Sequence, residues 1–243
     1  MRLTVMSYNV GHYNMGQRPF GYPEDVMNEK VTALKEMLME TGPDLIGLQE
    51  DYTWADRGKT LKSSTYLYSP VWRYRPSGSS SNIRAKYAAY SGTGELCQFS
   101  TGAYYRKAVL KVNGGRLLMI SAHATAHDGN SDKRKTEYAE LFEKVREEKW
   151  SWAVICGDFN TLTKTDKENL TAACRENSFE MAIGSYLPWI VTFMGRSEQA
   201  KKHSFDNILV SPGVTIRTVR ARRDWWERLY SDHVPVTAEV ELE

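Results

Sequence analysis

The sequence predicts an α/β sandwich with mixed β-sheets, and three features of the chain indicate this fold class. Short apolar segments, typical of buried strands, alternate with longer segments whose apolar residues recur at helical spacing. Two apolar strands flank Asn113-Gly114, a pair that favours a tight hairpin, so some strands must be antiparallel. Three further strand-like segments lie near the C-terminus. Many strands with few helices between them favour a mixed sandwich over a purely parallel, doubly wound sheet.

The first half of the chain begins with a strand and a helix. Residues 3–10 mix β-branched and apolar side chains, as strands do. Residues 24–40 carry apolar side chains at helical spacing, and the Gly42-Pro43 pair ends this predicted helix. Residues 44–49 form a short apolar strand. Residues 51–100 are aromatic, serine-rich and turn-rich, and loops of this kind often determine substrate specificity.

The second half alternates strands with helices. The predicted hairpin covers residues 106–123, and a charged helix with one apolar face covers residues 131–149. Residues 152–160 are a buried strand that ends in polar residues, and residues 167–177 favour a second helix. The remaining predicted strands are the segments SFDNILVS, VTIRTVRAR and VPVTAEVEL.

The composition indicates neither a boundary between domains nor a strongly charged chain. The 243 residues contain no proline-rich, serine-rich or charged linker, so we expect one domain that spans residues 1–243. The formal net charge of +2 indicates no basic footprint by itself. No apolar run approaches the roughly 18 residues of a membrane span, and the N-terminus is too polar for a signal-peptide core. The default expectation is a cytoplasmic monomer with reduced cysteines.

Polar side chains that can bind metal or move protons stand at the ends of successive predicted strands. They are Asn9, Glu50, His123, Asp158, Asn160, Asp206, Asp232 and His233. Because the ends of neighbouring strands converge in space, we expect these side chains to form one cluster on one rim of a sheet.

The residue types in this cluster predict phosphoryl chemistry. Glu50, Asp158 and Asp232 are hard oxygen ligands that suit Mg²⁺ or Mn²⁺ better than Zn²⁺. Two imidazoles beside carboxylates can neutralise charge on phosphate oxygens, and an aspartate can hold an imidazole in one tautomer. The chain has no G-x-S-x-G elbow, P-loop or G-x-G-x-x-G segment, which disfavours serine hydrolases, NTPases and Rossmann enzymes.

Five segments, in this order, resemble the endonuclease/exonuclease/phosphatase superfamily of DNase I-like phosphoesterases. They are SYNVG, DLIGLQE, ICGDFNT, SFDNILVS and SDHVPV, and they span nearly the whole chain. The resemblance implies a four-layer α/β/β/α sandwich with two mixed sheets between layers of helices. It also implies Mg²⁺- or Mn²⁺-dependent hydrolysis of a phosphate ester by in-line attack of water.

The resemblance implies a role for each residue that matches a family motif. Glu50 resembles the principal metal ligand, Asn9 contacts metal or phosphate, and Asp232 contributes to a metal site. The catalytic set implied by the resemblance is His123 on the scissile phosphate, Asp158 on the attacking water, Asn160 on the phosphate, and Asp206 paired with His233. Whether Asp158 or His233 removes the proton from water stays open, as does the number of metal ions.

Three positions depart from the family pattern. Gly11 stands where the abasic-endonuclease branch has a carboxylate, which disfavours that branch. The segment after His123 lacks the usual leucine and acidic residue, and Asn207 replaces an aromatic residue that commonly follows the aspartate. None of these changes removes a core catalytic group, so we expect an active enzyme.

Arginines provide the candidate substrate contacts. Arg134, in the helix after His123, resembles a recurring family arginine, with a solvated helix charge as the alternative. Arg222 and Arg223 precede two tryptophans and could grip a phosphate backbone, with an exposed strand face as the alternative. These basic segments favour a phosphodiester in nucleic acid over an inositol phosphate or a lipid headgroup.

Two further interpretations compete with a Mg²⁺-dependent nuclease or phosphatase. The fold could serve as a non-catalytic binding module, although such descendants usually lose at least one of these groups. His123 and His127 could instead form half of a zinc site. However, a spacing of four residues on a strand and loop does not bring both rings to one face.

Overall fold

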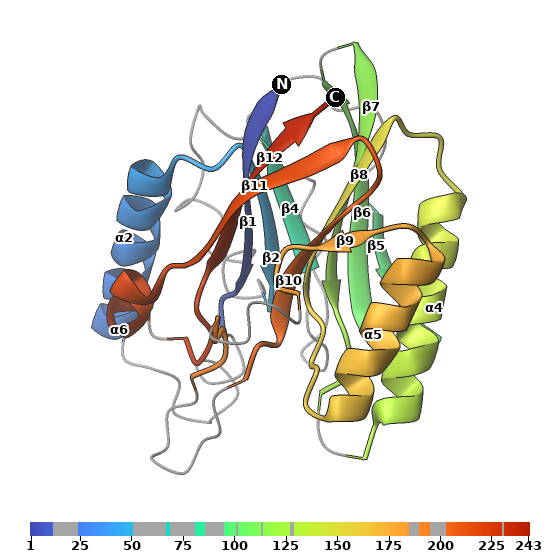
Figure 1. The fold of residues 1–243 in the computed structure, drawn as a ribbon. Helices are drawn as coiled ribbons and strands as arrows, with labels where there is room; N and C mark the ends of the chain where they lie inside the picture. The colour runs from blue at the N-terminus through green and yellow to red at the C-terminus, as the bar shows by residue number, and fades with distance from the viewer. Residues whose placement is uncertain are drawn as a thin grey trace.

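Two six-stranded sheets pack face to face, with helices on both outer faces, in this computed structural model (Figure 1). The structure describes residues 1–11, 24–50, 67–68, 81–85, 95–100, 102–112, 114–126, 129–184, 190–194, 203–229 and 231–243. The arrangement is the four-layer α/β/β/α sandwich expected from the sequence. No helix among these described residues is long and apolar enough to cross a membrane.

The first sheet, sheet A, has the strand order β11-β12-β1-β2-β4-β3. β1 pairs in parallel with β2, and every other strand pair of sheet A is antiparallel. Its strands are β1 (Arg2–Asn9), β2 (Leu45–Gln49), β3 (Leu67–Tyr68), β4 (Ser81–Ala85), β11 (Val214–Ala221) and β12 (Val236–Leu242).

The second sheet, sheet B, has the order β5-β6-β7-β8-β10-β9, and only β7 and β8 are parallel. Its strands are β5 (Glu95–Gln98), β6 (Tyr104–Val112), β7 (Gly115–His123), β8 (Trp152–Asp158), β9 (Glu180–Met181) and β10 (Asp206–Val210). β6 and β7 form the hairpin predicted around Gly114, so the sheets are mixed as expected.

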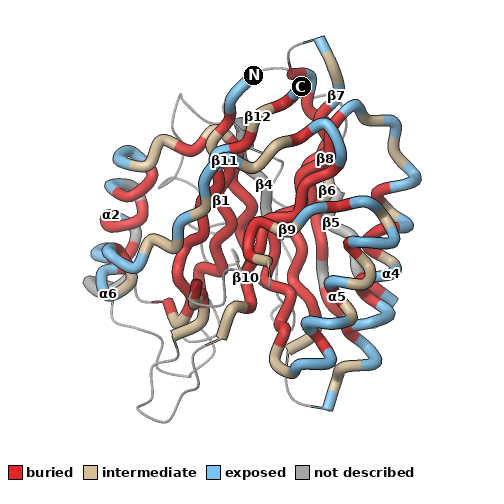
Figure 2. The backbone as a smooth tube through the Cα atoms, in the orientation of Figure 1, coloured by how far each residue is buried: buried red, intermediate tan, exposed pale blue. Residues whose placement is uncertain are grey.

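The space between the sheets is filled by apolar side chains from both of them. The central strands of both sheets are buried along most of their length (Figure 2). Val5 of sheet A and Met119 and Val154 of sheet B belong to this core and are fully buried. The alternate side chains of the same strands, such as Met6 and Ile120, face the outer helices. Because both faces of these strands are buried, their sequences are nearly continuous apolar runs.

Helices cover the outer faces of both sheets (Figure 1). α2 (Glu24–Thr41) and α6 (Trp226–Leu229) pack on sheet A, and the short 3-10 turn η1 (Arg223–Trp225) leads into α6. α4 (Ser131–Arg146) and α5 (Lys164–Glu176) pack on sheet B. α5 begins three residues before the predicted start because Thr163 and Asp166 form a capping box.

The sequence did not predict four short strands. β3, β4 and β5 lie in the segment with no regular pattern, and β9 has only two residues. β4 nevertheless pairs with all of β2, from Leu45↔Ala85 to Gln49↔Ser81. This tertiary pairing overrides the weak strand propensity of the serine- and asparagine-containing segment.

Candidate active site

Strand register brings three functional side chains together at one edge of sheet B. β7 and β8 place His123 opposite Asp158, and β8 and β10 place Asp206 opposite Asp158. Neighbouring strands are about 5 Å apart, so His123 and Asp206 flank Asp158 on either side, each within contact distance of it. The parallel β7–β8 pair contributes two strand ends, and antiparallel β10 contributes its beginning.

Sheet A contributes the other half of the cluster by the same logic. Parallel β1 and β2 place Asn9 opposite Gln49, and Glu50 follows with a φ of 53°, so the chain turns as soon as β2 ends. Antiparallel β12 places Val236 opposite Ser7, and His233 comes three residues earlier at the same edge. This edge is the one away from the two chain termini (Figure 1).

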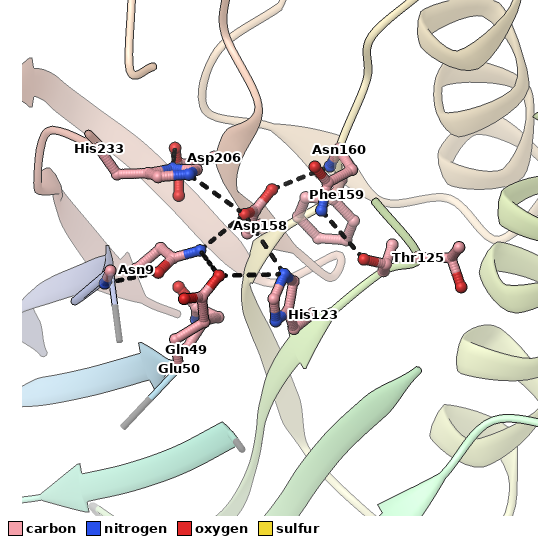
Figure 3. Close-up of polar contacts among 12 residues, drawn as sticks. Asn9, Gln49, Glu50, His123, Thr125, Asp158, Phe159, Asn160, Asp206 and His233 are labelled. Atoms are coloured by element: carbon pink, nitrogen blue, oxygen red, sulfur yellow. Dashed lines mark hydrogen bonds and ion pairs between the residues drawn. The ribbon is translucent and has the colours of Figure 1, made fainter. Parts of the chain in front are cut away.

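Asn9 connects two carboxylates from different sheets (Figure 3). Its Nδ2 donates to Asp158 Oδ2 at 2.9 Å and to Glu50 Oε1 at 3.1 Å. The backbone N–H of Gly11 donates to Asn9 Oδ1 at 2.9 Å, which fixes the orientation of the amide. In this arrangement the amide nitrogen of Asn9 is a donor that holds the two carboxylates together. The predicted contact of Asn9 with metal or phosphate stays a prediction.

His123 faces the same two carboxylates. Its Nε2 lies 3.6 Å from Asp158 Oδ2 and 3.8 Å from Glu50 Oε1. The ring is 6% exposed, and its Nδ1 is buried without a hydrogen-bond partner among the described residues. Its Nε2 can therefore donate to a phosphate oxygen, whereas no side chain holds the other ring nitrogen.

His233 lies between two buried aspartates. Its Nδ1 is 2.8 Å from Asp206 Oδ2, and its Nε2 is 3.6 Å from Asp158 Oδ2. Burial raises the pKa of Asp206 to about 6, against the opposing effect of His233. Burial alone would lower the pKa of His233, but the charges of Asp206 and Asp158 outweigh it and raise that pKa well above 6.5. The pair therefore favours an imidazolium held by a carboxylate.

Asn160 and Asp232 complete the predicted set. The backbone N–H of Asn160 donates to Asp158 Oδ1 at 3.0 Å, and the left-handed φ of 48° allows this turn. Asn160 Nδ2 donates to the carbonyl of Ala124 at 3.0 Å, which ties β8 to the loop after β7. Asp232 Oδ1 lies 4.0 Å from His233 Nε2, and its side chain is 21% exposed at the rim.

Two residues that sequence reasoning missed hold this edge together. Ser231 Oγ donates to the carbonyl of Asn9 at 2.9 Å and accepts from the His233 backbone N–H at 3.1 Å. Thr192 Oγ1 accepts from the Asp206 backbone N–H at 3.0 Å. Both side chains are fully buried. Ser231 could have been found from its place in the SDH triplet, whereas nothing local marks Thr192.

The donor set fits a hard divalent cation. Carboxylate oxygens of Glu50 and Asp158 converge on one amide N–H₂ group, the kind of positively polarised partner that a cation would replace. Ligand atoms of Asp158, Asp206 and His233 also lie within 4.8 Å of one another. In that second group, however, Asp206 and His233 already bind each other, so Glu50 with Asp158 is the better ligand pair.

Arg134 does not reach the site as a substrate contact. Its side chain is fully buried and forms a two-fold hydrogen bond with Asp166, at 3.0 Å from Nε and 2.9 Å from Nη2. A third bond runs from Nη1 to the carbonyl of Thr125 at 3.1 Å. A guanidinium with no exposed surface cannot grip substrate, so the predicted substrate role of Arg134 is wrong.

Arg222 and Arg223 follow β11, and acidic groups bind the Arg222 side chain. It contacts Asp224 Oδ2 at 2.7 Å and Glu40 Oε1 at 2.6 Å, which fastens the end of β11 to α2. The Arg222 backbone N–H donates to the carbonyl of Pro235 at 2.8 Å, two residues after His233. The end of β11 is therefore near this edge of sheet A, but the Arg222 side chain is engaged by acidic partners and not by the Asp158 cluster. His127 lies outside the described residues.

Comparison with known proteins agrees with this geometry. A model of the Endonuclease/Exonuclease/phosphatase family matches residues 6–233. No curated protein sequence is similar enough to count as a match.

Solved structures resemble this chain over its whole length. D. rerio TDP2 complexed with single strand DNA product has a TM-score of 0.77 at 15% identity, with 99% of each chain covered. An endonuclease/exonuclease/phosphatase from Bacteroides vulgatus has a TM-score of 0.72 at 18% identity, with 100% of each chain covered. The mannosyl-6-phosphatase Bt3783 of Bacteroides thetaiotaomicron has a TM-score of 0.68 at 18% identity, covering 99% of this chain and 100% of that one. At these identities the likeness shows the fold.

Proposed function

Because this chain belongs to the endonuclease/exonuclease/phosphatase family, we propose that it is a Mg²⁺- or Mn²⁺-dependent hydrolase of phosphate esters. The family match covers almost all of the chain and includes every strand end that contributes to the cluster around Asp158. A non-catalytic binding module would not need two buried histidines and four carboxylates at one edge.

One observation supports the proposal most strongly. Three nitrogen atoms face Asp158 Oδ2: Asn9 Nδ2 at 2.9 Å, and Nε2 of His123 and of His233 at 3.6 Å each (Figure 3). Each nitrogen comes from a different segment of the chain. The Asp158 carboxylate thus gathers three donors at one point before substrate binds, and preorganised donors of this kind can stabilise the charge on a bound phosphate.

Glu50 and Asp158 would hold the cation, with Asp232 at the rim as a further ligand. When bound, the cation supplies Lewis-acid neutralisation of charge on the phosphate oxygens. The carboxylate oxygens of these residues are hard ligands, which favours Mg²⁺ or Mn²⁺ over Zn²⁺.

The side chains divide the proton chemistry between them. Both ring nitrogens of His233 face carboxylate oxygens, an environment that favours the protonated ring, so His233 donates to a phosphate oxygen. Asp206 holds the other ring nitrogen and fixes the direction of that donor. Asp158, as a ligand of the cation, would orient the attacking water, and the Asn160 backbone N–H holds Asp158 in place.

We propose a phosphodiester in nucleic acid as the first substrate class. The similarity to TDP2 complexed with single strand DNA product supports it, and the arginine segments no longer do. A phosphomonoester of a sugar is the second candidate, because the mannosyl-6-phosphatase has the same fold over its full length.

A substrate panel tests the proposal. Single-stranded DNA, plasmid DNA, mannose 6-phosphate and an inositol polyphosphate would each be incubated with Mg²⁺, with Mn²⁺ and with EDTA. We expect metal-dependent hydrolysis that His233→Ala abolishes and Arg217→Ala, on the exposed face of β11, preserves. Cleavage of DNA alone supports the first substrate class, and release of phosphate from mannose 6-phosphate alone supports the second. Equal activity in EDTA would overturn the proposal.

A further inference from the structure

Residues 124–126, which follow His123, have most of their backbone polar groups bound. The N–H of Ala124 donates to the carbonyl of Asp158 at 2.9 Å, and the carbonyl of Ala124 accepts from Asn160 at 3.0 Å. Farther along, Asn130 Nδ2 donates to the carbonyl of Ala126 at 2.8 Å. Backbone groups in a loop are usually left to water, so this density of partners marks a segment that is held in one conformation.

Helix α4 provides the central part of this anchorage. Glu137 accepts from the backbone N–H of Thr125 at 2.8 Å and also from the Thr125 hydroxyl. Arg134 Nη1 donates to the Thr125 carbonyl at 3.1 Å. Both charged side chains are fully buried on α4. One turn of helix therefore binds the N–H, the carbonyl and the hydroxyl of a single loop residue.

Asp166 makes the burial of Arg134 tolerable and links α4 to α5. Its two carboxylate oxygens bind Arg134, and Oδ2 also accepts from the N–H of Thr163 at 2.8 Å. A buried charge is stable only when paired and hydrogen-bonded, as this guanidinium is. Glu137 and Arg134, which bind Thr125, are consequently held rigidly in the helical layer over sheet B.

The two histidines of the site differ in how they are oriented. Asp206 holds Nδ1 of His233 at 2.8 Å, so a side chain fixes that ring. Nδ1 of His123 is buried without a partner among the described residues. The direction of the His123 ring is therefore set by packing and by the backbone that carries it, two residues before Thr125.

We propose that Glu137 and Arg134 are positioning residues for His123. Their hold on Thr125 fixes the backbone after β7 and thereby aims His123 Nε2 at the point it shares with Asp158 and Glu50. The inference rests on the proposed function for the role of His123 as a phosphate contact, but the positioning itself can be measured without turnover.

Two variants at Glu137 separate the effect of its hydrogen bonds to Thr125 from the effect of its side-chain size. Glu137→Gln keeps an oxygen for the Thr125 N–H and an amide that can donate to the Thr125 hydroxyl, so we expect it to behave like the parent. Glu137→Leu is similar in size but accepts nothing. Val145→Ala, buried on the same helix about two turns after Glu137, controls for lost stability.

The first measurement uses metal-free protein and NMR of the histidine ring protons, assigned with His123→Ala and His233→Ala. In Glu137→Leu we expect the His123 signals to shift or broaden while those of His233 stay in place. Glu137→Gln and Val145→Ala should leave both sets unchanged. Unchanged His123 signals in Glu137→Leu, or equal changes at both rings, would overturn the proposal.

The second measurement is a double-mutant cycle on the Mg²⁺-dependent hydrolysis of bis-p-nitrophenyl phosphate. We expect Glu137→Leu to lower kcat roughly tenfold to a hundredfold with little change in KM, as a small misplacement does. In the His123→Ala background the same change should lower kcat less than about twofold. Tyr138→Phe, which loses a bond to the carbonyl of Phe159, should keep its effect in that background.

The two measurements fail in different ways. Additive effects in the cycle would overturn the positioning role even if the enzyme is active. If the parent protein hydrolyses no phosphate ester, the proposed function falls, and the NMR comparison alone decides whether Glu137 positions His123.

Discussion

Asp206 Oδ2 lies 2.8 Å from Nδ1 of His233, and both side chains are buried. The pair spans the two sheets, since Asp206 opens β10 and His233 precedes β12. Because Nδ1 is occupied by Asp206, Nε2 is the atom that His233 presents to Asp158 and, in the proposed function, to substrate. The direction of this donor is therefore fixed before any ligand binds.

His233 should stay protonated in the metal-free protein well above pH 6.5. The neighbouring charges of Asp206 and Asp158 raise its pKa against the opposing effect of burial. A raised folded-state pKa stabilises the fold fully below the unfolded value, and this stability is lost as pH rises through the folded pKa. NMR titration of the ring checks the value. Asp206→Asn should lower the pKa of His233, and an unchanged titration in this variant would refute the pairing.

Gly11→Ala should disturb the site as well as the fold. Gly11 has a φ of +67°, and a Cβ built there would lie 2.8 Å from Ser231 Oγ. The clash acts on the N–H that orients Asn9, so we expect lower activity and a loss of about 1–3 kcal/mol. Gly114→Ala, with a φ of +77° and no atom within 4 Å, is the matched control. Urea unfolding and kcat would be compared, and equal effects of the two changes would contradict the account.

Asp166 should stabilise the protein only above acid pH. Burial alone would raise its pKa, but hydrogen bonds from Arg134 and Thr163 outweigh this and lower it below 3.8. The stabilisation is present above the unfolded pKa and is lost as pH falls through the lowered one. At neutral pH Asp166→Asn should cost about 3 kcal/mol, because it leaves Arg134 without its carboxylate.

The exposed pair of Lys164 and Glu168 on the same helix is the control for Asp166. Glu168→Gln should cost less than about 0.5 kcal/mol at any pH. Urea unfolding at neutral and acid pH measures both variants. A difference between parent and Asp166→Asn that stays constant into strong acid would show that the carboxylate is not responsible.

The two sheets should unfold together as one domain. One buried core contains Val5 and Val236 of sheet A and Met119 and Val154 of sheet B. Either sheet alone would expose the apolar side chains of its inner face to water. We expect circular dichroism and tryptophan fluorescence to report the same urea midpoint. Two separated transitions would indicate two domains.

The sequence predicted the strands that carry the site because they are buried on both faces and end in polar residues. The runs that stop at Asn9, Glu50 and Asp158 are largely apolar, and the predicted strand boundaries agree with the structure to within two residues. β4 could not be predicted in this way, since its pairing with β2 comes from tertiary contact and not from its own composition.

Side-chain roles were predictable only where local sequence determines them. The SDH triplet and the GDFN segment indicated the catalytic groups, and strand register then brought them together. The buried ion pair of Arg134 could not be predicted from local sequence, because its partner Asp166 lies 32 residues away. The ion pair between Arg222 and Glu40 could not be predicted for the same reason, because Glu40 lies in a helix far earlier in the chain.

The most direct test of the central claim is the rate of Mn²⁺-dependent phosphodiester hydrolysis by the parent protein and by Asp158→Asn. Asp158 is the carboxylate on which Asn9, His123 and His233 converge, and the amide has nearly the same shape. The account predicts hydrolysis by the parent that EDTA abolishes and a kcat at least about a hundredfold lower in the variant. A variant as active as the parent, at the same stability, would contradict the assignment of this cluster as the active site.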